Sequence, residues 1–518
     1  MSLLHWYSFP VWLVAACTAM EAAARVFRAP RARRWLLPLQ WVARPWAIWA
    51  VFNIIYRAFA AHGFNNRRTF PFYFNLWHER ETWSEAARRL LGSGPLWFWS
   101  AVLLPLAVLF LLTVRRLARP SLSRGRAAVF LLWLLLLAFA LPLAYDCLPD
   151  GTGDPLQNRG SFLNAWHDAG NTMLYCMPLV KNKSHFLRHF EKLQPELIRF
   201  IHAGDHPPGA TLAPFWLGRL LGAREDIRAD VVRYALGTVG FSALSVFAMF
   251  FLGRSIFSST RVGLLSAALW IARPASLVYN IFAPDSICMV FYILCLALIW
   301  RVTVANKTPV MEMLGLGVVL AVLSMLNFNW PLLWVIFTVF LGLRSRQVGW
   351  PAAELLVRGI VPSAVTAALL GWTCWHYRLN YFAIFSYAAK RFEFYDLRSP
   401  YQWIMALIGG QLDLWLMGGA FTAYVFWRCL LRQLRHRPPP LQAIFALVIL
   451  AVYMLPTLIS DSLKLETSRV WAWVTAVPLV MTVRELQSLT EAEFYLPLAA
   501  ALSLLQYYGM RLFLVSAG

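Results

Sequence analysis

Long apolar runs separated by short polar turns dominate this chain. A helix needs about 20 apolar residues to cross a bilayer, and windows of that kind number about fourteen here. They lie near residues 4–24, 36–58, 96–116, 127–145, 234–253, 262–281, 284–301, 310–326, 329–344, 354–375, 402–428, 441–460, 469–483 and 493–515. The pattern predicts an all-α, polytopic integral membrane protein with about 12 to 14 transmembrane helices.

One long polar segment, residues 146–233, interrupts this pattern. Within it, residues 184–202 carry apolar side chains at nearly helical spacing, which predicts a helix along the membrane surface. Residues 210–222 are apolar over only about thirteen positions and are followed by charges, which suits a juxtamembrane helix better than a span. Polar segments at 376–401 and 461–469 are expected on the same side of the membrane as 146–233.

Composition agrees with a membrane protein and excludes a soluble domain of this length. Hydrophobic residues make up 59% of the 518 residues and charged residues only 14%. The net charge of +22 comes from short basic clusters between apolar runs rather than from one stripe, so no nucleic-acid partner is expected. By the positive-inside rule the clusters 25–34, 115–126 and 428–437 are cytoplasmic, which places the amino terminus and the 146–233 loop outside.

The chain divides into three parts by its apolar pattern. Residues 1–126 form a three-span extension with an outward loop near 59–95, residues 127–484 form the core, and residues 485–518 form a last span. Residues 1–8 contain no Lys or Arg, so the first apolar run is expected to be an uncleaved span rather than a signal peptide. Cys147 and Cys176 both fall in the outward loop, where they are either a disulfide pair or two separate thiols.

The run Asp205-His206-Pro207-Pro208-Gly209, continuing to Gly222, resembles the His-Pro-Pro, helix and glycine signature of a bacterial glycosyltransferase group. This is the dolichyl-phosphate-mannose-protein-mannosyltransferase-like group of the GT-C fold. Residues 251–257, and Pro274 with residues 282–285, resemble two further segments of it. Lys464, Glu466 and Arg469 resemble a late outward loop that contacts the carrier phosphate. The similarity covers residues 127–484.

This resemblance implies an inverting glycosyltransferase of the bacterial inner membrane with its active site on the periplasmic side. The expected donor is a sugar linked to polyprenyl phosphate, and the expected acceptor is an envelope glycan, lipid or protein. Membrane lipid is the third expected partner, and no divalent metal or other cofactor is expected. The group carries a catalytic Asp early in its first large outward loop. Here Asp146 lies at the span exit, whereas Asp168 lies closer to the spacing of the group.

Such a transfer requires a base that takes the acceptor proton and cations that hold the leaving phosphate. Asp146, in Tyr145-Asp146-Cys147, is the first candidate for the base and Asp168 is the second. The competing interpretation is that each is a solvated loop acid or a helix cap.

Candidate substrate-binding residues are spread over three segments. Asp205 and His206 precede a rigid Pro-Pro turn, although His206 is also explained as a loop histidine at the start of a helix. Lys464 and Arg469, with Glu466 between them, supply charge for a phosphate or else contact lipid headgroups. Asp285, just inside a predicted span, either serves the site or pairs with Arg273. His185 and His189 have the i, i+4 spacing of metal ligands but no local carboxylate, which favours surface histidines.

A second hypothesis is a flippase or transporter of lipid-linked sugars without catalysis, and a third is a non-catalytic scaffold. Transport predicts charged residues along a path through the membrane. The interiors of the predicted spans are nearly uncharged apart from Asp285, Glu312 and Asp413, which favours a site at the membrane face.

Overall fold

The protein is almost entirely helical where its computed structural model describes it. The described residues are Ala15, Thr18, Ala19, 38–52, 74–76, 94–119, 124–148, 180, 182–197, 204–224, 227–279, 284–391, 400–459 and 470–516. Strands in these ranges form one antiparallel pair, β1 (Phe74–Leu76) with β2 (Leu514–Ser516). The predicted helical, multi-pass membrane architecture is confirmed at this level.

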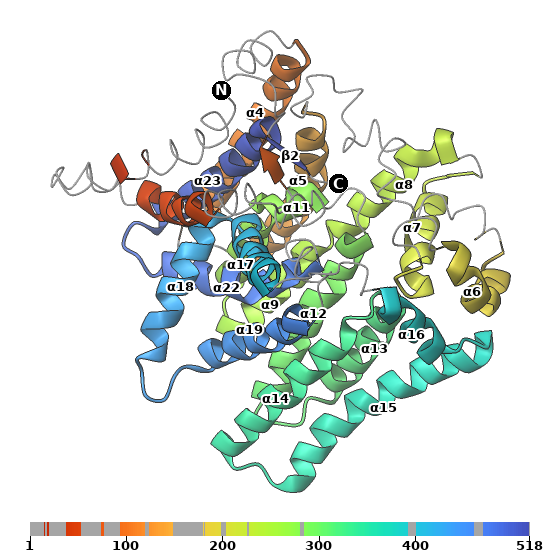
Figure 1. Ribbon diagram of the computed structural model, residues 1–518. Coiled ribbons are helices and arrows are strands. Elements are labelled where there is room, and N and C mark those ends of the chain that lie inside the picture. The colour runs from red at the N-terminus through yellow and green to blue at the C-terminus, as the bar shows by residue number, and fades with distance from the viewer. Residues whose placement is uncertain are drawn as a thin grey trace.

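The helices named here are shown in Figure 1, most of them with labels. Their bounds are α4 Gly94–Leu117, α5 Arg124–Asp146, α6 Lys183–Leu197, α7 Pro208–Leu220, α8 Ile227–Ser242, α9 Ser245–Phe257, α10 Thr260–Ala272, α11 Pro274–Tyr279, α12 Pro284–Val304, α13 Val310–Leu326, α14 Trp330–Val348, α15 Ala352–Tyr377, α16 Tyr381–Arg391, α17 Pro400–Met417, α18 Ala420–Leu434, α19 Leu441–Ile459, the 3₁₀ helix η5 Ala472–Thr475, α22 Ala476–Gln487 and α23 Ala492–Phe513.

Six helical segments in the described ranges are long and apolar enough to cross a membrane. They are 96–117, 125–146, 232–257 (α8 with α9), 285–304, 352–377 and 441–459, and a seventh results if the bent pair α17 and α18 is one span. The sequence predicted about fourteen spans of about 20 residues. Other predicted spans occur as shorter or interrupted helices: residues 262–281 contain α10 and α11 with Arg273 between them, and residues 469–483 contain η5 and part of α22.

The outer helices expose apolar side chains in the way that lipid contact requires. In α4, Leu104 is 65% exposed, and in α15 Ile360 and Trp372 are each 57% exposed. By contrast, α12 and α22 lie in the core with most of their side chains buried. Such large apolar surfaces are rare on soluble monomers and support a membrane environment.

Several helix ends meet at one end of the bundle, which we call the basic end and define by Arg261, Arg301, Arg358, Arg432 and Arg484. The Arg261 Nε atom donates to the Leu117 carbonyl at 3.1 Å, and the Trp300 indole donates to the Ser255 carbonyl at 3.0 Å. Arg484 lies over the Phe257 ring at 5.9 Å from its centroid. These contacts bring together the last turns of α4, α9, α12 and α22, and the first turn of α10. We expect this end to be cytoplasmic by the positive-inside rule.

The juxtamembrane helix predicted at residues 210–222 corresponds to α7, which is 13 residues long. It packs along α8, and α8 with α9 continues as one apolar segment to Phe257 at the basic end. The carboxyl end of α5 lies at the opposite end, because α5 begins beside the basic end. α7 therefore returns along α8 without crossing the bundle, as predicted.

The amphipathic helix expected at 184–202 is α6, but its apolar face does not lie along a membrane surface. Phe186, Phe190 and Leu197 are each fully buried in a cluster that includes Phe215 of α7 and Ile384 of α16. In Figure 1, α6, α7 and α16 lie together at the right of the molecule. The periodicity identified the helix correctly but not its partner, because an apolar stripe packs equally well on protein and on lipid.

Candidate functional site

The predicted site residues that the structure describes lie at the end of the bundle opposite the basic end. We call this region the carboxylate end and define it by Asp146, Asp205 and Asp285. Each residue belongs to a different element: α5 contacts α11, α11 contacts α12, and α13 contacts both α12 and α7.

Asp146 is the last residue of α5 and is only 4% exposed. The preceding residue, Tyr145, anchors this helix end, because its hydroxyl donates to the Leu504 carbonyl at 3.1 Å and its ring lies 5.0 Å from that of Tyr507. The end of α5 also packs against α11, which in turn contacts α12. Asp146 is therefore held in place by the core rather than solvated as a loop acid.

Asp205 and His206 form the turn that precedes α7, and both are partly exposed. The buried side chain of Gln194 fixes this turn, since its Nε2 atom donates to the Gly204 carbonyl at 2.8 Å and to the Ile384 carbonyl at 3.0 Å. Pro207 stands at the N-cap with φ −58°, and Pro208 opens the helix. The turn thus joins α6, α7 and α16, and its polar side chains reach solvent from a rigid backbone.

Gln194 offers a direct test of how the turn is held. Replacing it with Leu removes both hydrogen bonds and takes from the buried Gly204 carbonyl its Gln194 donor, at a cost of about 1–3 kcal/mol. We expect a lower thermal midpoint of the purified protein and faster proteolysis in the turn at Gly204. Gln487→Leu at the basic end is the comparison, and an equal effect of the two changes would contradict this role of Gln194.

Gly209 permits the first turn of α7 to approach the last turn of α13. A Cβ atom at this position would lie 2.9 Å from the Met325 carbonyl carbon and still closer to its oxygen. Because backbone atoms cannot move aside cheaply, a side chain at this position would separate α7 from α13. The close approach brings the Asp205–His206 turn beside the end of α13.

Gly209→Ala is therefore expected to destabilise the protein by about 1–3 kcal/mol, as overpacking does. Gly371→Ala in α15 is the matched control, since nothing lies within 4 Å of a Cβ there and alanine favours the helix. The measurement is the thermal midpoint of each variant compared with that of the native protein. Equal midpoints for the two variants would show that the contact between α7 and α13 leaves room for a methyl group.

Asp285 lies in the first turn of α12 and is 3% exposed. The Asn327 amide, just after α13, donates to the Asp285 carboxylate at 3.5 Å, while its oxygen accepts from the Asn329 backbone at 2.9 Å. A carboxylate is also favoured at the positive end of a helix. Asp285 therefore connects α12 to the end of α13. Its partner Asn327 lies two residues after Met325, which Gly209 contacts.

The ion pair that the sequence suggested between Arg273 and Asp285 does not form. Arg273, 2% exposed, donates instead to the Ser276 hydroxyl at 3.1 Å, to the Ala472 carbonyl at 3.0 Å and to the Thr475 hydroxyl, and its guanidinium lies over the Trp270 ring. Arg273 thus holds η5 against α10 and α11. The sequence showed a charge at a helix break but gave no sign of this partner.

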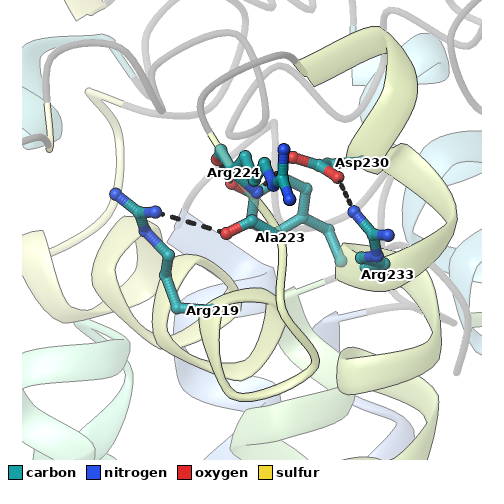
Figure 2. Close-up of polar contacts among 6 residues, drawn as sticks. Arg219, Ala223, Arg224, Asp230 and Arg233 are labelled. Carbon is teal, nitrogen blue, oxygen red and sulfur yellow. Dashed lines mark hydrogen bonds and ion pairs between the residues drawn. The ribbon is translucent and has the colours of Figure 1, made fainter.

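The connection between α7 and α8 is fixed by a small polar network (Figure 2). Arg219 donates to the Ala223 carbonyl at 3.3 Å, and the buried carboxylate of Asp230 accepts from the Arg224 backbone and from Arg233. Gly218 faces the Tyr234 ring, with no space for a Cβ atom. Asp230 therefore holds residue 224, just after α7, against the first turn of α8.

Four of the predicted site residues lie outside the described residues. They are Asp168, Lys464, Glu466 and Arg469, and their roles stay predictions, as does the pairing of Cys147 with Cys176. The imidazole rings of His185 and His189 stack on the exposed side of α6, with their centroids 4.1 Å apart. In the described part of the chain, no three His, Cys, Asp or Glu side chains cluster closely enough to hold a metal ion.

Tyr381, the first residue of α16, was not predicted from the sequence to have a role in the site. Its hydroxyl lies in a hydrogen-bond network that holds the elements of the Asp205–His206 turn together. It donates to the Ser324 carbonyl at 2.7 Å and accepts from the Trp330 indole at 3.1 Å. Burial raises the pKa of this hydroxyl well above its usual value, so it remains a donor at physiological pH. The Tyr381 hydroxyl thus fixes α16 to α13, and with α16 the Ile384 carbonyl that accepts from Gln194.

Comparison with known proteins does not assign this chain to a family. No protein-family model matches the sequence, and no curated protein matches it.

Proposed function

We propose that this protein is an integral-membrane glycosyltransferase that takes a sugar from a polyprenyl-phosphate carrier and passes it to an envelope glycan, lipid or protein acceptor. The proposal places the reaction at the carboxylate end, on the periplasmic face of a bacterial inner membrane. One observation carries most weight: Asp146, the Asp205–His206 turn and Asp285 come from separate elements, yet they share the end of the bundle that lies opposite the arginines.

In the proposed reaction, Asp146 or Asp168 takes the proton of an acceptor hydroxyl as its oxygen attacks the anomeric carbon. The bond between that carbon and the phosphate oxygen breaks, and the electron pair leaves with the polyprenyl phosphate. A carboxylate positioned within hydrogen-bond reach of the hydroxyl is suited to this task. Asp205, His206 and Asp285 are proposed to bind the sugar or acceptor.

The leaving phosphate needs positive charge nearby. Lys464 and Arg469 are the proposed cations, with Glu466 between them. Arg273 supports this assignment from the described part of the chain, since it fixes Ala472 and Thr475, which follow Arg469 closely in the sequence. A segment attached at this point begins from a rigid position.

Two of the three acids predicted within spans favour catalysis at one face over transport through the bundle, whereas the third, Asp413, is buried in α17. Glu312, one of the few acids predicted within a span, pairs with Arg301 on the exposed surface of the basic end. Asp285 lies at the opposite end, in the first turn of its helix. These two acids therefore mark the ends of the bundle rather than a path between them.

Mass spectrometry of lipid that copurifies with the full-length protein tests the proposal. We expect a polyprenyl phosphate carrying a single sugar, and enrichment of that lipid in the Asp146→Asn variant because it binds the donor without consuming it. Copurification of phospholipids alone from both proteins would count against a carrier-linked donor.

A further inference from the structure

A hollow at the basic end, far from the carboxylate end, has the chemistry of a phosphate site. It has a volume of about 360 Å³ and lies between α18, α19, α22 and the end of α9. We call it the basic hollow and define it by Arg432, Gln433, Gln442, Arg484, Glu485 and Ser488. A second hollow of about 420 Å³ shares Arg432, Gln433 and Gln442 and adds His436.

The charges of the basic hollow leave one arginine available. Arg432 pairs with Glu485, so these two charges neutralise each other. Arg484 is exposed, and its contact within the described residues is the Phe257 ring at 5.9 Å. Among the residues that the structure describes, no carboxylate neutralises this guanidinium, so the hollow attracts an anion.

The polar atoms around this charge add a second requirement. The half-buried Gln442 side chain offers an amide donor and acceptor in the hollow, and the Ser488 hydroxyl, which donates to the Glu485 carbonyl at 2.7 Å, keeps its lone pairs to accept a hydrogen bond. An occupant that carries hydroxyl groups beside its phosphate can bond to Gln442 and Ser488 through the hydroxyls and to Arg484 through the phosphate.

The surrounding helices are suited to acyl chains. On α18, Leu431 is 58% exposed and Trp427 is 38% exposed, and on α19 Leu447 is 37% exposed. Leu431 directly precedes Arg432 of the basic hollow. An amphiphile can thus place its phosphate in the hollow and its chains along the apolar faces of these two helices.

From this combination we infer that the basic hollow binds the headgroup of an anionic phospholipid that carries hydroxyl groups, such as phosphatidylglycerol, in the leaflet at the basic end. The site does not depend on the proposed transferase reaction, since it uses other helices and lies at the other end of the bundle. A failure of one proposal therefore leaves the other standing.

Native mass spectrometry of the full-length protein in a nonionic detergent tests this inference with three added ligands: dioleoyl phosphatidylglycerol, dioleoyl phosphatidylcholine and soluble glycerol phosphate. We expect phosphatidylglycerol to bind about tenfold more tightly than phosphatidylcholine, and we expect that glycerol phosphate does not displace it. Arg484→Gln is expected to weaken the binding of phosphatidylglycerol about tenfold or more, because a charge-assisted hydrogen bond is lost.

Two further variants separate a defined site from general electrostatic attraction. Arg346→Gln removes the same charge from an exposed position near the end of α14 and should leave the affinity within about twofold of the native value. Ser488→Trp changes no charge but fills the hollow, and it should abolish tight binding. The inference is overturned if Arg346→Gln weakens binding as much as Arg484→Gln, if Ser488→Trp has no effect, if the two lipids bind equally, or if glycerol phosphate competes fully.

Discussion

Asp146→Asn is expected to lower the rate of sugar transfer by about 10² to 10⁴-fold, the range that a positioned general base contributes. The amide keeps the size of the side chain but cannot accept the acceptor proton. Because Asp146 is buried at an anchored helix end, the change should leave the fold intact. Turnover of a polyprenyl-phosphate sugar by the purified protein measures the effect, with the thermal midpoint as a check on folding.

Two companion variants define what the result means. Asp168→Asn addresses the other candidate base, and Glu312→Gln is a control that removes a carboxylate from the basic end. We expect native activity in the control. Full activity in both Asp146→Asn and Asp168→Asn would refute the assignment of the base.

Glu354→Leu is expected to destabilise the protein by about 1.5–3 kcal/mol, because the buried Arg358 guanidinium loses its carboxylate partner and keeps the Val302 carbonyl. Arg358 is fully buried in α15, where its Nε atom donates to Glu354 at 2.7 Å and its guanidinium lies 4.1 Å from the centre of the Trp350 ring. Glu354 also accepts from the Thr308 hydroxyl at 2.9 Å. Loss of the carboxylate should lower the thermal midpoint strongly and reduce the yield of folded protein.

The double variant Glu354→Leu with Arg358→Met tests the cause of this loss. Replacing a buried ion pair by apolar side chains of similar volume is often neutral or stabilising. We therefore expect the double variant to recover most of the thermal midpoint lost in Glu354→Leu. A double variant as unstable as the single one would show that packing around Thr308, rather than the unpaired charge, causes the loss.

The helices of this protein could be predicted from the apolar pattern, whereas their interruptions could not. The predicted span 402–428 bends by 104° between α17 and α18, where Gly419 has φ +99°. The average hydrophobicity of a stretch of residues cannot reveal such a bend, because the bend depends on the backbone angles of one glycine. The break at Arg273 has a similar origin, since the partners of its guanidinium lie about 200 positions away in η5.

The candidate site shows a similar division between local and distant information. That Asp146 ends a helix, and that the Asp205–His206 turn precedes another, followed from the sequence. The contacts that hold them did not: Asn327 reaches Asp285 from 42 positions away, and Gln194 reaches Ile384 from 190 positions away. Neither Gln194 nor Asn327 carries a local signal, because an amide in a helix or turn is ordinarily a surface residue.

The most direct measurement is made on the full-length protein reconstituted in vesicles with polyprenyl-phosphate monosaccharides labelled in the sugar, in the presence of envelope extract. We expect the native protein to form a new glycosidic bond to the acceptor and to release polyprenyl phosphate, and we expect Asp146→Asn to bind the donor without forming product. Movement of intact donor across the vesicle membrane, with no labelled acceptor from any sugar in the set, would contradict a transferase and indicate a transporter.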